Sequence, residues 1–282
     1  MLRRALSLTL LLALSLATGC SGDDGRAASS ERKHSRAAVQ AQAPPPSTSA
    51  ALVRVPDGAA AQRRLGYVDI AALATTRTPL SRREVADAAL GRGARHLAAL
   101  PRDAVRSAVQ VGTDVTILRG PGAVSAAGVR SPPDGVVLGA RDANVRKLAL
   151  GRPATSAITP LAQSAVQSCL GQTIAQTSFG PAVMGRDSAL GAGLAQSGDR
   201  PAGIQLRICG APRLLRDLHA MERALKRSFA DASGGAGREP VIGEREIGER
   251  EIVAATIAAD AIPAPRLRAL LAGGELHALA WR

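Results

Sequence analysis

The alternation of apolar and polar positions predicts short strands and helices along most of the chain. Period-two alternation and short apolar runs indicate strands at 66–70, 114–118, 135–139, 172–178, 189–196, 203–209 and 251–259. Helical spacing and helix-start residues indicate helices at 81–100, 103–110, 142–148, 159–170, 212–229 and 265–272. Residues 276–281 form a terminal segment to which we assign no type.

Two of these helices have the clearest sequence signals. Ser81 and Glu84 have the spacing of a capping box, and Leu80 with Val85 has that of a hydrophobic staple. After Pro212, apolar residues recur on one stripe of a helix, and we expect this stripe to face the core: Leu214, Leu218, Met221, Leu225 and Phe229.

The order of the elements predicts the fold class. Several strands follow one another without a helix between them, which favours an α+β domain with an antiparallel or mixed sheet and packed helices. The order also allows two similar halves, divided near Gly151. The pentapeptide Ile-Gly-Glu-Arg-Glu occurs twice in tandem, at 242–246 and 247–251. Two copies are too few for a solenoid, so we expect a surface hairpin or the start of a strand.

The first 20 residues have a different character. Arg3 and Arg4 precede an apolar run at 5–16, and the small residues 17–19 lead to Cys20. The run is too short to span a bilayer and is typical of a signal segment. This stretch resembles a bacterial lipoprotein signal, in which a peptidase cuts before a cysteine that carries a diacylglyceryl group. Ala17 stands where that family usually has leucine. The alternative is an ordinary secretory signal in which Cys20 has no role.

The resemblance implies three parts of the chain and a location. Residues 1–19 would be a signal peptide, 20–56 a lipid-anchored flexible tether, and 57–282 an extracytoplasmic α+β domain. The tether segment is rich in Ser, Ala, Gln and Pro without apolar periodicity. We expect a protein anchored in the bacterial cell envelope by acyl chains such as palmitate on Cys20, with its domain outside the cytoplasm.

The two remaining cysteines predict a disulfide. Outside the cytoplasm, an even pair such as Cys169 and Cys209 is expected to oxidise. The two are 40 positions apart, and closing a loop of that length stabilises a fold by about 4 kcal/mol on the chain-entropy model. Two buried free thiols or one reactive thiol remain as alternatives.

The charge of the chain is strongly basic but dispersed. The formal net charge is +13, and arginines are spread singly and in pairs among carboxylates. We therefore expect no nucleic-acid partner, whereas an anionic envelope polymer stays a possible partner. Aromatic residues make up 1% of the chain, which disfavours base or sugar stacking as a binding mode.

The sequence shows no recognisable catalytic motif. The histidines lack zinc-ligand spacing: His34, His96, His219 and His277. No GxSxG elbow or phosphate-binding loop occurs, and carboxylates that could do acid–base chemistry are scattered: Asp69, Asp142, Asp187 and Glu251. We therefore expect no catalytic residue, no metal ligand and no cofactor. The function predicted is a non-catalytic binding or envelope-associated lipoprotein, for example a carrier of an apolar ligand. The alternative is an extracytoplasmic hydrolase with an unrecognised site.

Overall fold

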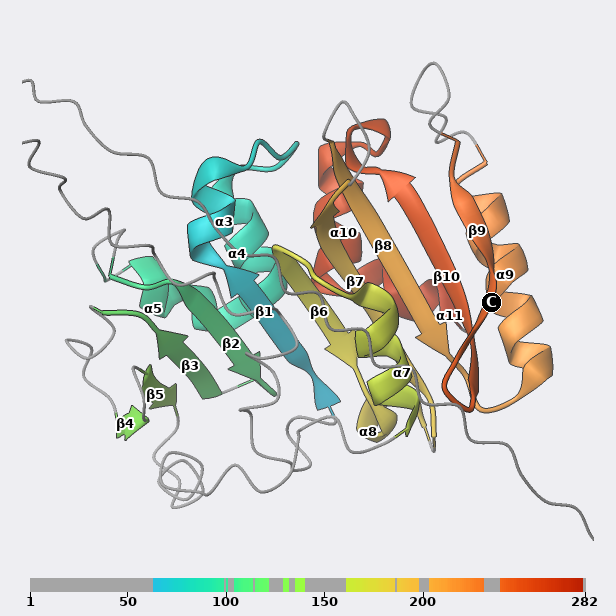
Figure 1. The fold of residues 1–282 in the computed structure, drawn as a ribbon, viewed down its shortest axis with the longest axis horizontal. Coiled ribbons are helices and arrows are strands. Elements are labelled where there is room, and N and C mark those ends of the chain that lie inside the picture. The colour runs from blue at the N-terminus through green and yellow to red at the C-terminus, as the bar shows by residue number, and fades with distance from the viewer. Residues whose placement is uncertain are drawn as a thin grey trace, which may run out of the picture. The chain divides into compact units, whose positions relative to one another are not determined.

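The computed structural model describes residues 63–98, 100, 104–113, 115–121, 129–131, 135–139, 161–185, 187–197, 203–230 and 239–280. Within these residues the chain forms a ten-stranded sheet with helices packed on it, which confirms the predicted α+β class (Figure 1). The segments expected to be a signal and a tether, the helix expected at 142–148 and the division expected near Gly151 lie outside the described residues.

The sheet is antiparallel throughout. Its strands, in chain order, are β1 (Leu65–Asp69), β2 (Ser107–Val111), β3 (Val115–Arg119), β4 (Val129–Ser131), β5 (Gly135–Gly139), β6 (Ala175–Phe179), β7 (Ala189–Gln196), β8 (Ile204–Ala211), β9 (Val241–Ile247) and β10 (Arg250–Ala258). They lie side by side in the order β4-β5-β3-β2-β1-β6-β7-β8-β10-β9, and each neighbouring pair is antiparallel.

Helices cover both faces of the sheet. They are α3 (Ile70–Thr75), α4 (Arg82–Leu90), α5 (Ala94–Ala98), α7 (Leu161–Leu170), α8 (Pro181–Met184), α9 (Leu215–Ser228), α10 (Ala264–Ala272) and α11 (Gly274–Ala280), with short 3₁₀ turns η1 (Gly91–Gly93) and η3 (Ala259–Ala261). In Figure 1, α7 crosses the near face of the sheet, while α4, α10 and α11 lie behind it. We call these the α7 face and the multi-helix face.

The two faces have cores of different character. Large side chains fill the core on the multi-helix face, where Leu206 and Ile208 of β8 pack with Leu225 of α9 and Leu267 of α10. On the α7 face the core is made mostly of small side chains: Ala162, Ala165, Ala189, Cys209, Ala211, with Val166, Leu170 and Ile252. The period-two alternation of strand residues decides which side chain joins which core.

The structure confirms the helix start at Ser81. The Ser81 hydroxyl accepts a hydrogen bond from the Glu84 backbone N–H, and the Glu84 carboxylate accepts one from the Ser81 backbone, which is the predicted capping box. The helix continues to Leu90, and Gly91 with a φ of 55° follows it. The helix expected at 81–100 therefore stops at Leu90, because the positive φ of Gly91 interrupts the helical backbone, and η1 and α5 follow it.

Three predictions are wrong or incomplete. The helix expected at 103–110 is strand β2 instead, because pairing with both β1 and β3 overrides a weak helix-start signal at Asp103. Leu214 does not join the buried stripe: α9 begins at Leu215, so Leu214 precedes the helix and is exposed. The terminal segment given no type, 276–281, overlaps helix α11.

The tandem pentapeptide forms a hairpin, which is one of the two structures expected from the sequence. The first copy lies in β9, and the second copy supplies the last residue of β9, the turn at Gly248 and Glu249, and the start of β10. Gly248 has a φ of 62°, which suits the first turn position of a two-residue hairpin. Glu246 lies directly opposite Glu251 in this register.

Across the part of the chain described here, the helices are too short or too polar for any of them to cross a membrane.

Candidate functional site

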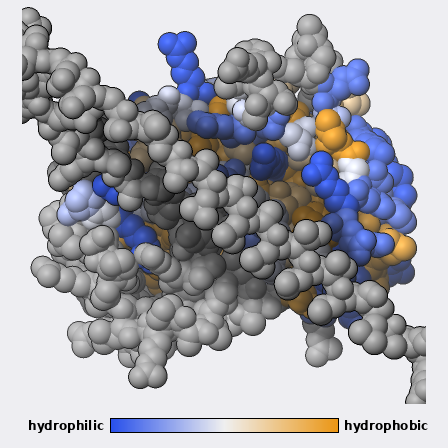
Figure 2. All heavy atoms as spheres, viewed as in Figure 1, coloured by the Kyte–Doolittle hydropathy of each residue, from blue (hydrophilic) through white to orange (hydrophobic). Residues whose placement is uncertain are grey.

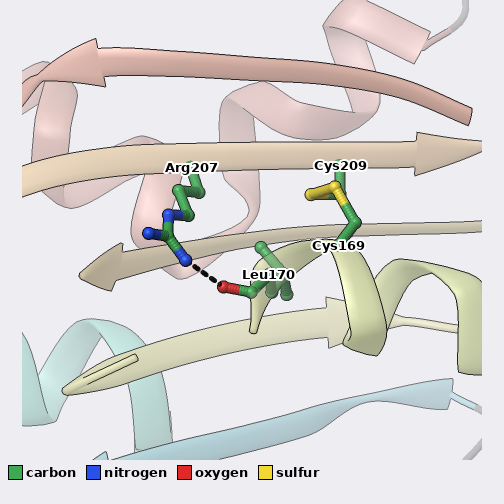
Figure 3. Close-up of a disulfide and its surroundings, with 4 residues drawn as sticks. All are labelled: Cys169, Leu170, Arg207 and Cys209. Atoms are coloured by element: carbon green, nitrogen blue, oxygen red, sulfur yellow. Dashed lines mark hydrogen bonds between the residues drawn. A yellow bond between two sulfur atoms is a disulfide. The ribbon is translucent and has the colours of Figure 1, made fainter. Parts of the chain in front are cut away.

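The predicted disulfide is present and joins the two layers on the α7 face. Cys169, near the end of α7, is bonded to Cys209 on β8, with the two Cα atoms 6.1 Å apart (Figure 3). The bond holds α7 against the strand pair β7–β8, where the facing residues are too small to interlock deeply. Cys20, the predicted lipid-bearing residue, lies outside the described residues.

An arginine next to the disulfide caps α7. The Arg207 guanidinium donates a hydrogen bond of 3.0 Å from Nη1 to the carbonyl of Leu170, the last residue of the helix (Figure 3). A cation at this position neutralises the partial negative charge at the helix C-terminus. Burial, and then the positive charge of Arg245, lower the pKa of Arg207. Because Arg207 lies two residues before Cys209 on β8, this contact holds the end of α7 beside the disulfide.

A chain of neutral side chains continues the contact between α7 and the sheet. Gln167 Nε2 donates to Ser178 Oγ at 2.7 Å, and Gln176 Nε2 donates to Gln167 Oε1 at 2.6 Å. The Thr173 hydroxyl donates to Gln176 Oε1 at 3.0 Å. These buried groups satisfy one another, as buried polar groups usually do. Amides and hydroxyls arranged this way stabilise packing and offer no proton donor or acceptor suited to acid–base catalysis.

A polar cluster lies between α9 and the edge strand β9. His219 Nδ1 and Glu244 Oε1 are 2.5 Å apart, and Lys226 Nζ lies 2.8 Å from Glu222 Oε1. One ligand atom each from His219, Glu222 and Glu244 lies within 4.8 Å of the others, a donor set that could take a divalent metal such as zinc. The groups are partly exposed and already paired with one another and with Lys226. Exposed pairs of this kind stabilise by about 1 kcal/mol or less.

The helix residues of this cluster, His219, Glu222 and Lys226, lie on a polar face of α9. Figure 2 shows mainly hydrophilic side chains on the side of the domain where α9 and β9 lie. The sequence did not indicate that Glu244 would come to lie beside His219, since 25 residues separate them. The glutamates of the tandem pentapeptide are the sequence signal that could indicate a partner for His219.

Asp69, one of the four scattered carboxylates, has a structural role. It caps α3 by accepting a 2.8 Å hydrogen bond from the Ala72 backbone N–H, and its side chain is buried. Burial raises the pKa of Asp69, and the backbone hydrogen bonds partly oppose this. Ser107 lies directly opposite on β2, and its buried hydroxyl has no hydrogen-bond partner among the described residues. Among the contacts described for Asp69 and Ser107, no third residue joins them to form a catalytic triad.

The structure does not bring Asp69 together with the other candidate carboxylates. Asp69 ends β1, whereas Asp187 precedes β7 and Glu251 is the second residue of β10, and both lie at the opposite end of the sheet. Asp142 lies outside the described residues.

The histidines also lie apart from one another. The ring of His277 packs edge-on against Phe179 with ring centroids 4.8 Å apart, and His96 belongs to α5. Burial, then the charge of Arg95, lower the pKa of His96. His34 lies outside the described residues.

Exposed apolar side chains gather at one end of the sheet. We call this the α8 end; it is where β6 and β8 finish and where β1, β7 and β10 begin. Of the five exposed large hydrophobic side chains among the described residues, four come from segments at this end: Leu161 (64% exposed), Val183 (45%), Leu214 (42%) and Leu215 (53%). The fifth, Val241 (61%), begins β9 at the opposite end.

A small cavity also lies at the α8 end. Met184 of α8, Leu190 of β7, Pro212 and Met221 of α9 contribute to its lining, and its volume is about 30 Å³. A space of this size holds one or two water molecules, whereas pockets for small organic ligands measure several hundred Å³. The cavity is therefore no chamber for a lipid-sized ligand.

Comparison with known proteins returned no relative: no family model, curated protein or solved structure matches the chain.

Proposed function

We propose that this chain is an extracytoplasmic lipoprotein, held at a membrane by acyl chains on Cys20, whose disulfide-stabilised domain is a non-catalytic binding or envelope-associated module. The observation that carries the proposal is the bond between Cys169 and Cys209. The chain has three cysteines, so the bond leaves Cys20 as the single remaining thiol. That thiol stands where the lipoprotein-like signal ends, and disulfides persist chiefly outside the cytoplasm.

The contacts of the titratable groups support a non-catalytic module. His219 is engaged with Glu244, Asp69 caps a helix, and Arg207 caps another. Catalytic sites instead bring groups with shifted pKa values together around a cleft. The small cavity at the α8 end gives no support to the carrier version of the proposal, because a lipid does not fit into about 30 Å³.

The experiment that tests the proposal is the replacement Cys20→Ala in the natural host or in a bacterium that processes lipoproteins. The wild-type protein is expected in the membrane fraction, with an N-terminal fragment whose mass includes acyl chains. The variant is expected in the soluble fraction, because each buried acyl CH₂ contributes about 0.8 kcal/mol to membrane binding. Ser21→Ala, which leaves the thiol in place, serves as the matched control. A mature wild-type protein without acyl mass, or a Cys20→Ala variant that stays in the membrane, contradicts the proposal.

A further inference from the structure

We propose that the α8 end of the sheet rests on the lipid bilayer to which Cys20 is attached, with Val183, Leu214 and Leu215 in contact with the membrane surface. The inference rests on the proposed anchoring and adds to it an orientation: one particular end of the domain faces the membrane.

The first step is the distribution of exposed apolar side chains. Single exposed hydrophobic residues are ordinary on protein surfaces. Here, however, Leu161 begins α7, Val183 belongs to α8, Leu214 precedes α9 and Leu215 begins it. Three segments that are separate in sequence thus bring exposed apolar side chains to the same end of the sheet. The neighbouring cavity between α8 and α9 adds an apolar recess lined partly by Met184 and Met221.

The second step is the direction from which the chain arrives. Leu65, the first residue of β1, pairs with Ser178 near the end of β6. Because β6 leads into α8, the start of β1 lies at the α8 end. The chain that comes from Cys20 therefore enters the sheet at the same end as the exposed apolar side chains. This shared position is our reason for choosing the bilayer, rather than a soluble partner, as the surface that these side chains meet.

The third step concerns charge, which is mixed at this end. Arg213 and Arg216 flank the leucine pair, and Arg216 lies 3.6 Å from Asp217. The turn of the β9–β10 hairpin brings Glu246, Glu249 and Glu251 to the same end. Arg250 of this hairpin donates a hydrogen bond to the Asp187 carbonyl. With both signs present, the contact is apolar in nature, and it does not depend on anionic lipid or on low salt.

The fourth step is the strength of such a contact. A few partly exposed side chains bind a membrane weakly by themselves. Attachment through Cys20 keeps the domain at a high effective concentration beside the bilayer, and under that condition weak contacts decide which surface faces it. The experiment must therefore measure orientation in the attached protein rather than binding of the free domain.

Tryptophan reporters at the two ends of the sheet test the proposal. Trp281 is the one native tryptophan, so the background is the chain from Cys20 onward with Trp281→Phe. Leu215→Trp places a reporter at the α8 end, and Val241→Trp is the matched control at the opposite end, since both positions are exposed. Cys20, the one thiol outside the disulfide, is coupled to a maleimide lipid in phosphatidylcholine vesicles that contain brominated lipid.

The expected result is quenching about twofold or more stronger at position 215 than at position 241, as for a side chain held at the headgroup boundary. Raising the salt concentration is expected to leave this ratio unchanged. Equal quenching at the two positions overturns the proposal. Far-UV circular dichroism checks that each variant is folded, and Val183→Trp gives a second reporter at the α8 end if Leu215→Trp does not fold. Because the chemical link replaces cellular acylation, failure here is distinct from failure of the Cys20→Ala experiment.

Discussion

Gly66 shows how closely one helix approaches the sheet. A Cβ atom built on this residue of β1 would lie 2.0 Å from the carbonyl oxygen of Ala89 in α4. The obstructing atom belongs to the backbone of a packed helix and cannot swing aside as a flexible side chain could. Gly243, in edge strand β9, offers a direct comparison, because its added Cβ would meet nothing within 4 Å.

We predict that Gly66→Ala destabilises the domain by about 2–3 kcal/mol, since α4 must shift away from β1 to make room. Gly243→Ala is expected to change the free energy of unfolding by about 0.5 kcal/mol or less. Urea unfolding of the two variants and the wild type measures both values. Similar midpoints for Gly66→Ala and Gly243→Ala would show that α4 is not packed as closely on β1 as the structure has it.

At the scale of elements, the β9–β10 hairpin carries an unfavourable charge arrangement. Glu246 and Glu251 are directly opposite, so their side chains leave the same face of the sheet, and Glu244 lies two residues away on that face as well. Like charges placed directly opposite destabilise a strand pair. The duplicated pentapeptide produces this arrangement, because a two-residue turn folds one copy back on the other.

We predict that Glu251→Lys stabilises the domain by up to about 1 kcal/mol, because an attraction to Glu246 replaces a repulsion. The gain should shrink as salt is added, since the pair is exposed and screened. Glu249→Lys makes the same change in net charge in the turn, away from the cross-strand pair, and is the matched control. Thermal unfolding at low and high ionic strength provides the measurement. A gain of the same size in Glu249→Lys would assign the effect to net charge rather than to the cross-strand pair.

Elements with strong local signals were predictable from the sequence, and those defined by pairing were not. The capping box at Ser81 determines where α4 begins, and it is contained within four residues. The segment of strand β2 has a helix-like local sequence, whereas its structure depends on pairing with β1 and β3 on either side. Helical periodicity likewise placed Leu214 on the buried stripe, although the helix begins one residue later.

In the candidate site, too, some features could be predicted from the sequence and others depend on long-range pairing. The pairing of Cys169 with Cys209 followed from counting cysteines and from the expected compartment, without any knowledge of distance. The contact of His219 with Glu244 and the shared end of Leu161, Val183 and Leu215 arise from strand order and register, which no local pattern encodes. These long-range features are the ones on which the proposed membrane-facing end depends.

For the molecule as a whole, the disulfide compensates for an uneven core. The multi-helix face buries large side chains from several helices, whereas the core beneath α7 is made mostly of small side chains. Small side chains remove less apolar area from water and therefore contribute less to stability. The Cys169–Cys209 bond closes a loop of 40 positions and restricts the unfolded chain, which offsets part of that deficit.

We predict that reduction of this bond lowers the free energy of unfolding by about 4 kcal/mol, a large part of the 5–15 kcal/mol typical of a domain. The measurement is guanidinium unfolding of a Cys20→Ala chain with and without dithiothreitol, so that the disulfide is the only group that the reagent can change. A Cys169→Ala, Cys209→Ala double variant should unfold like the reduced chain and should not respond to the reagent. Coincident unfolding curves for the oxidised and reduced chains would mean that the packing of α7 is sufficient without the bond.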